Sequence, residues 1–191
     1  IEEDFDAIYL ERVKELSLSK DAIQAQKSMP IVFSPIHGAS GKMVPAALKA
    51  FGFENIQVVK EQAEPDGNFP TVIYPNPEEA EALTLAVALG QKVGAALVLA
   101  CDQDGDRYAA VVPNELGEYE LLNGNQTGTL LVYYLLSRRK ELGLAKSTDF
   151  MVNTIVTTEL INKIAEGFGV PCYNVLTGFK NIASIILQKE G

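Results

Sequence analysis

Short apolar runs alternate with helical segments along the first two thirds of the chain. The apolar runs are typical of buried strands, which we predict at residues 31–33, 55–59, 95–101 and 108–112. Between them we predict helices at residues 4–17, 43–52 and 75–92. The last of these opens with Pro75-Asn76-Pro77 and has glutamates in its first turns, which the positive end of a helix favours. This alternation indicates an α/β fold with a largely parallel sheet.

The rest of the chain predicts a second, smaller unit. A turn at residues 113–117 leads to a returning strand at 119–121, and a helix runs from Gln126 to about Glu141. Strands and helices then alternate, at residues 150–156, 157–168, 173–176 and from 181 onward. We therefore expect two successive α/β/α units with mixed, mainly parallel sheets. The first occupies residues 1–121, and the second, incomplete one occupies residues 122–191.

Composition narrows the class of protein. Of the 191 residues, 47% are hydrophobic and the net charge is −9, which indicates a globular protein with a real core. No basic stripe suited to nucleic acid is present, and the longest apolar run is too short to cross a membrane. Cys101 and Cys172 lack disulfide or CxxC spacing, so we expect reduced thiols and a cytoplasmic location. Because Ile1 lies inside a helical pattern, we expect a piece of a longer chain.

An acidic loop separates the last two strands of the first unit. It reads Asp-Gln-Asp-Gly-Asp-Arg and places carboxylates at Asp102, Asp104 and Asp106. Carboxylates that converge on a turn repel one another unless a hard cation sits among them, and Mg²⁺ suits a site that leaves positions for phosphate oxygens or water. Gly105 permits tight curvature, and Arg107 is suited to grip a phosphate. The loop thus predicts a magnesium site beside a phosphate site.

Competing interpretations of this loop remain open at this point. A calcium EF-hand is excluded, because Arg107 and Pro113 stand where that motif requires Gly and Glu. A solvated acidic turn without metal is one alternative. Another is a haloacid-dehalogenase-type phosphatase, in which Asp102 would be a nucleophile rather than a ligand. A third is a non-catalytic module that binds only metal or partner domains.

Other candidate residues carry weaker signals. Lys180, in the loop Thr-Gly-Phe-Lys between a strand and a helix, could contact phosphate or act as an acid near a sugar hydroxyl. His37 is the only histidine, and in a Pro-Ile-His-Gly loop we expect it to hydrogen bond with the backbone. The sequence contains no Ser-His-Asp grouping, Walker motif or GxGxxG, so nucleotide-dependent kinase chemistry has no support.

Taken together, the loop motifs resemble one family. They are Ser-Pro-Ile-His-Gly-Ala-Ser-Gly at 34–41, Pro-Asp-Gly-Asn-Phe-Pro at 65–70, Pro-Asn-Pro-Glu at 75–78, Asp-Gln-Asp-Gly-Asp-Arg at 102–107, Gly-Asn-Gln at 124–126 and Thr-Gly-Phe-Lys at 177–180. In this order they are similar to the α-D-phosphohexomutases, a family of phosphoglucomutases and phosphomannomutases. The Thr-Gly-Phe-Lys form with Asn125-Gln126 is closest to its phosphopentomutase-like branch.

The resemblance implies specific roles. Residues 1–121 would be the second of four family domains, and residues 122–191 part of the third. Asp102, Asp104 and Asp106 would hold Mg²⁺, Arg107 would contact phosphate, and Lys180 would be the lysine of the catalytic cleft.

The family's phosphoserine, its sugar-specificity loop and its first and fourth domains have no counterpart in this sequence. The intact parent is then expected to move a phosphoryl group between hydroxyls of a hexose or pentose. This chain alone is expected to be inactive.

Overall fold

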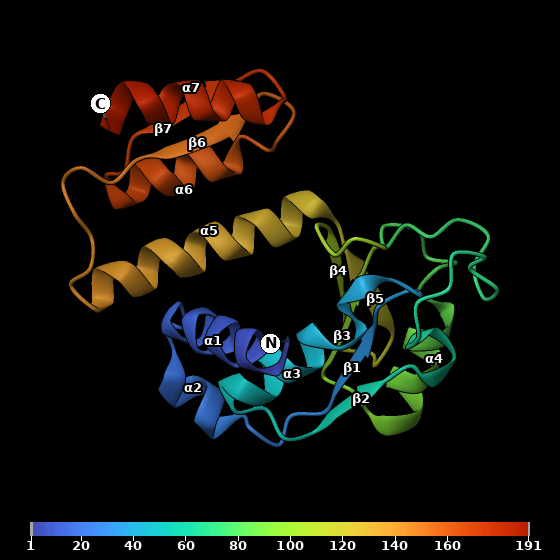
Figure 1. Cartoon of the computed structure of the whole chain (residues 1–191). Helices are drawn as coiled ribbons and strands as arrows, with labels where there is room; N and C mark the ends of the chain where they lie inside the picture. Colours follow the sequence, from blue (N-terminus) through green and yellow to red (C-terminus); the bar gives the residue numbers. More distant parts are fainter. Residues whose placement is uncertain (1, 191) are drawn as a thin grey trace. The chain divides into compact units, whose positions relative to one another are not determined.

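The structure is a computed structural model that describes residues 2–190. The chain forms two compact units, residues 1–123 and residues 124–191. Figure 1 shows helices packed on a sheet in each of them. Three of the five strand pairings among the described residues are parallel and two are antiparallel. The expected α/β class with mixed, mainly parallel sheets is confirmed.

The first unit is built on a five-stranded sheet with the order β2-β1-β3-β4-β5. Its strands are β1 (Ile31–Ser34), β2 (Ile56–Val58), β3 (Leu97–Cys101), β4 (Tyr108–Pro113) and β5 (Tyr119–Leu122). β2 and β3 flank β1 in parallel, whereas β4 and β5 continue the sheet as antiparallel hairpins. All four residues of β1 are buried, as expected for a strand covered on both faces.

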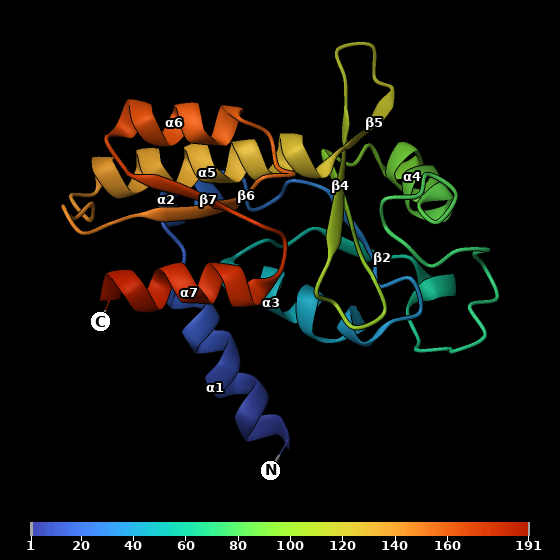
Figure 2. The ribbon, with the colours of Figure 1, turned by 90° about the horizontal axis from the view of Figure 1, so that it is seen from above.

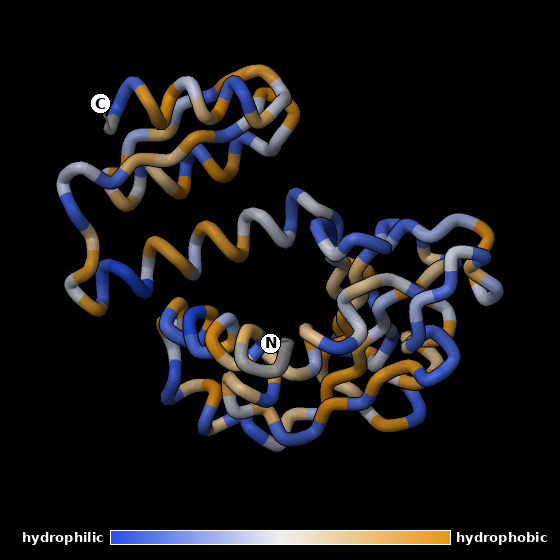
Figure 3. Tube along the Cα trace, in the orientation of Figure 1, coloured by the Kyte–Doolittle hydropathy of each residue, from blue (hydrophilic) through white to orange (hydrophobic). Residues whose placement is uncertain are grey.

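Helices cover both faces of this sheet. They are α1 (Glu2–Glu15), α2 (Lys20–Ala25), α3 (Met43–Phe51) and α4 (Thr84–Val93). In Figures 1 and 2 the strands lie between α3 on one side and α4 on the other. The core between sheet and helix includes Val32, Val98 and Ala86, each fully buried. Apolar positions gather along these central strands in Figure 3.

One local prediction in this unit was wrong, and one short helix was not predicted. The helix predicted from residue 75 begins only at Thr84, because side chains bond the preceding backbone into turns. Asn76 accepts a hydrogen bond from the Glu78 amide at 3.1 Å, and Glu81 accepts one from the Ile73 amide at 3.2 Å. The second difference is α2, a six-residue helix that the apolar pattern did not indicate because none of its residues is buried.

The second unit contains α5 (Gly124–Glu141), β6 (Met151–Thr154), α6 (Leu160–Phe168), β7 (Cys172–Val175) and α7 (Phe179–Glu190). β6 and β7 pair in parallel, with Met151 opposite Cys172, and in Figure 1 they lie between α6 and α7. α5 packs on α6, where the Tyr133 and Phe168 rings meet edge to face at 5.9 Å. None of the described helices in either unit is long and apolar enough to span a membrane.

Candidate metal centre

The acidic loop connects the two strands β3 and β4. Cys101 pairs with Tyr108 in the antiparallel register, so residues 102–107 form the tip of a hairpin. The amide of Asp102 donates to the carbonyl of Arg107 at 3.3 Å and closes this tip. Gly105 has φ +77°, a backbone conformation that most side chains disfavour. The sheet therefore presents the loop at the end of one of its most buried strands.

The three aspartates converge in this loop. One carboxylate oxygen from each of Asp102, Asp104 and Asp106 lies within 4.8 Å of the other two. Asp102 is buried, whereas Asp104 and Asp106 are exposed. The negative charge of Asp104 raises the pKa of Asp106, with smaller contributions from burial and from Asp102. A set of oxygen donors that repel one another suits a hard divalent cation, which would relieve this repulsion.

Arg107 is anchored to the buried aspartate. Its Nε donates to Oδ2 of Asp102 at 2.8 Å, and its backbone amide donates to Oδ1 at 3.1 Å. Burial alone would raise the pKa of Asp102, but the hydrogen bonds and charge of Arg107 outweigh it and hold that pKa below its ordinary value. The Arg107 side chain is 55% exposed, and among the described residues its terminal nitrogens have no hydrogen-bond partner. They are thus oriented but available to an anion.

Two other segments brace the loop. The amide of Ala39 donates to the carbonyl of Gln103 at 2.8 Å, and Nε2 of Gln103 donates to the carbonyl of Pro75 at 2.7 Å. Gly38 lies so close that a Cβ at this position would stand 2.7 Å from the Gln103 backbone. Neither Gly38 nor Gln103 was predicted from the sequence to have a role. The only signal was that the motifs at 34–41 and 75–78 are rich in small and turn-forming residues.

His37 bonds with backbone, as expected, and also with a side chain. Its Nδ1 lies 3.3 Å from the carbonyl oxygen of Glu64, and its Nε2 lies 2.9 Å from the hydroxyl of Thr71. The imidazole is buried, with 6% of the residue exposed. His37 therefore belongs to the interior that supports the loop, rather than to its exposed surface.

Lys180 lies in the second unit, whereas the groups gathered around Asp102 all come from the first. It lies two residues after Gly178, which has φ +123°, and its side chain is exposed at the start of α7. Asn181 holds this turn, because its Nδ2 donates to the carbonyls of Leu176 at 3.0 Å and Thr177 at 3.2 Å. The loop is therefore ordered by its own hydrogen bonds.

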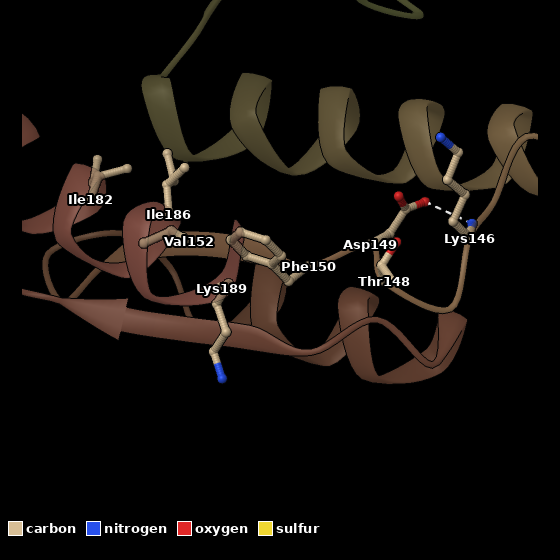
Figure 4. Close-up of a pocket in the computed structure, with 8 residues that line it drawn as sticks. All are labelled: Lys146, Thr148, Asp149, Phe150, Val152, Ile182, Ile186 and Lys189. Atoms are coloured by element: carbon tan, nitrogen blue, oxygen red, sulfur yellow. Dashed lines mark hydrogen bonds between the residues drawn. The ribbon is translucent and has the colours of Figure 1, made fainter. Parts of the chain in front are cut away.

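A pocket of about 630 Å³ is also present in the second unit (Figure 4). Its lining residues are Lys146, Thr148, Asp149, Phe150, Val152, Ile182, Ile186 and Lys189. Asp149 is already bonded to the Lys146 amide and to Arg139, each at 3.0 Å, and these bonds lower its pKa. Lys189 lies over the Tyr173 ring, 4.5 Å from its centroid. No predicted site residue lines this pocket.

Two family models match the chain over most of its length. The model for the phosphoglucomutase/phosphomannomutase alpha/beta/alpha domain II matches residues 7–117, and the model for domain III matches residues 123–190. A phosphoglucomutase of Staphylococcus saprophyticus is 36% identical over 95% of this chain and 32% of its own length. A phosphopentomutase of Homo sapiens is 35% identical over 90% of this chain and 29% of its own length. The chain thus spans about a third of the length of these relatives.

Solved structures share the fold. A phosphoglucomutase/phosphomannomutase family protein from Burkholderia thailandensis aligns with a TM-score of 0.73 and 20% identity, over 97% of this chain and 36% of its own. An N-acetylphosphoglucosamine mutase from Aspergillus fumigatus, in complex with GlcNAc-6P and magnesium, aligns with a TM-score of 0.58 and 14% identity, over 93% of this chain and 36% of its own. With both family models matched in sequence order, the chain belongs to the phosphoglucomutase/phosphomannomutase family.

Proposed function

We propose that this chain is the metal-bearing middle part of a phosphosugar mutase. The intact protein would move a phosphoryl group between two hydroxyls of a hexose or pentose phosphate. The observation that carries the proposal is the convergence of three aspartate oxygens within 4.8 Å of one another, in a chain that belongs to this family. One related structure was solved with magnesium, which supports Mg²⁺ as the ion for this site. Residues 1–121 and 122–191 would correspond to domain II and part of domain III.

Asp102, Asp104 and Asp106 are the proposed ligands of Mg²⁺. Bound there, the ion would supply positive charge that offsets the negative oxygens of a phosphoryl group in transfer. Arg107 would bind phosphate through its two terminal nitrogens, because its Nε is held by Asp102 and fixes the plane of the guanidinium. Planar, pre-oriented donors of this kind add electrostatic stabilisation without reorganisation during the reaction.

Lys180, in the second unit, would be a second cationic group that contacts a phosphate or a hydroxyl of the sugar substrate. The phosphoserine that stores the phosphoryl group, and the first and fourth domains, would come from parts of the protein outside this sequence. The curated relatives are named for glucose and for pentose phosphates, so both substrate classes are tested below. The unpaired thiols of Cys101 and Cys172 support a cytoplasmic location for the intact protein.

A phosphatase that uses Asp102 as nucleophile is disfavoured by the position of that carboxylate. Asp102 is 1% exposed, and each of its oxygens accepts a hydrogen bond from Arg107. A nucleophilic oxygen must be exposed to the phosphorus of an incoming substrate, and a 1% exposed carboxylate is not. The same arrangement suits a residue that orients an arginine and shares one oxygen with a metal ion.

The proposal is tested in the intact protein that contains this chain. We expect Asp104→Asn to weaken Mg²⁺ binding and to lower mutase activity about 100-fold, since it removes one of three charged ligands. Activity is measured with glucose, mannose and ribose 1-phosphates, and Mg²⁺ affinity by titration calorimetry. The control is Glu79→Gln, which removes the charge of an exposed carboxylate outside the loop. If Asp104→Asn leaves both the affinity and the activity unchanged, the proposed metal centre is wrong.

A further inference from the structure

Hydrogen bonds connect the polar side chains of Ser34, Gln62, Thr71 and His37, of which all but Thr71 are buried. Ser34 and Gln62 are fully buried, and the hydroxyl of Ser34 donates to Oε1 of Gln62 at 2.6 Å. Nε2 of Gln62 donates to the hydroxyl of Thr71 at 3.0 Å, and that hydroxyl lies 2.9 Å from Nε2 of His37. Buried polar groups are costly unless every one is paired, so a complete chain of this kind fixes the positions of its members.

The direction of each hydrogen bond between these side chains follows from the partners of His37 and Ser34 at the two ends of the series. Nδ1 of His37 faces the carbonyl oxygen of Glu64, so in a neutral ring it carries the proton. Nε2 then accepts the hydroxyl proton of Thr71, whose oxygen in turn accepts from Gln62. At the other end, the oxygen of Ser34 accepts from the amide of Ile36 at 3.1 Å. In this order each of these hydrogen bonds joins one donor to one acceptor.

His37 is also tied to the same segment by its backbone. Its amide donates to the carbonyl of Gln62 at 3.0 Å, and its carbonyl accepts from the amide of Asp66 at 3.1 Å. Ile36 and His37 have φ +45° and +58°, the left-handed region that is strained for a β-branched residue such as Ile36. Such a backbone persists only where its surroundings hold it in place, and here four groups of His37 do so.

The next two residues carry this position to the metal loop. Gly38 packs against the backbone of Gln103, and the amide of Ala39 donates to its carbonyl at 2.8 Å. Gln103 stands between two of the proposed metal ligands, Asp102 and Asp104. The turn that contains His37 is therefore the part of the fold against which the aspartates are aligned.

We infer that His37 is a positioning residue for the metal centre, acting through Ala39 and Gln103 rather than by contact with substrate or metal. The inference rests on the proposed function, in which residues 102–106 hold a divalent cation. The pair of His37 and Thr71 acts as one unit, because the hydroxyl of the half-buried Thr71 satisfies Nε2 of the buried His37 ring. Breaking their contact releases the turn and loosens the alignment of the ligands.

A double-mutant cycle on the full chain tests this inference. Thr71→Val removes the hydroxyl with little change of shape, and His37→Asn keeps a donor near Nδ1 and tolerates positive φ. The affinity for Mn²⁺, used as a paramagnetic probe, is measured together with amide exchange at Ala39. Outer-shell partners of metal ligands are commonly worth 10-fold or more in affinity, so each variant should bind Mn²⁺ about 10-fold more weakly. The double variant should bind no more weakly than either single variant.

Two controls separate positioning from loss of stability. Thr71→Ser retains the hydroxyl and should restore affinity for Mn²⁺ and slow exchange at Ala39. Ile31→Val removes a buried methylene at the start of β1 and should lower the unfolding temperature without weakening Mn²⁺ binding.

The two possible failures are distinguishable. If the unmodified chain does not bind Mn²⁺, the proposed metal centre fails, and exchange at Ala39 still reports whether the Thr71 contact holds the turn. If Thr71→Val and His37→Asn are folded and bind Mn²⁺ as the unmodified chain does, His37 has no positioning role. If both variants bind more weakly and their losses add, the claim that His37 acts through its pairing with Thr71 is wrong.

Discussion

The close approach of Gly38 to the acidic loop leads to a sharp prediction. A Cβ at residue 38 would lie 2.7 Å from the Cα and carbonyl oxygen of Gln103 and 2.8 Å from the carbonyl oxygen of Asp102. All three atoms belong to backbone, so no side chain can rotate away to relieve the contact. Gly38 itself has φ −96°, which any residue adopts, so the effect of Gly38→Ala is purely steric.

We expect Gly38→Ala to lower the free energy of unfolding of the first unit by about 1–3 kcal/mol, the usual cost of overpacking. The added methyl should also displace Gln103 and weaken Mg²⁺ binding. Urea unfolding followed by circular dichroism gives the first quantity, and calorimetry gives the second.

The matched control is Gly67→Ala, because a Cβ at residue 67 meets nothing within 4 Å. It should leave both quantities near those of the unmodified chain. The reasoning is refuted if Gly38→Ala and Gly67→Ala behave alike.

Two further predictions concern the hydrogen bonds of Asn181, in the turn before Lys180, and the carboxylate of Asp102. Asn181→Ala removes the donors that bond the carbonyls of Leu176 and Thr177. We therefore expect faster amide exchange around Lys180 and a free energy of unfolding that is lower by about 1 kcal/mol. Ser184→Ala, on the same helix, should change neither quantity. The pKa of Asp102 lies below 3.8 in the folded chain, so its ionisation stabilises the fold above that pH and less so as the pH falls through the folded pKa. In Asp102→Asn the free energy of unfolding should therefore fall less steeply with decreasing pH below pH 3.8. An unchanged dependence of the free energy of unfolding on pH in this range would contradict this.

The local chemistry of the acidic loop was readable without a structure. Carboxylates at alternate positions between two apolar runs are close in any hairpin that joins those runs, whatever surrounds it. The order of strands and helices was predictable for the same reason, since burial periodicity is a property of neighbouring residues. The start of α4 was not predictable in this way. The side chains of Asn76 and Glu81 accept hydrogen bonds from backbone amides before Thr84, and these bonds compete with the helix.

The sequence by itself determined the α/β class, the family resemblance and the identity of the candidate ligands. Only the tertiary structure decided which distant residues support those ligands. Gln103 meets Ala39 and Pro75, and His37 meets Thr71, across separations of 28 to 64 residues. Such contacts depend on how the sheet brings its loops together, and no local pattern of polar and apolar residues encodes that arrangement.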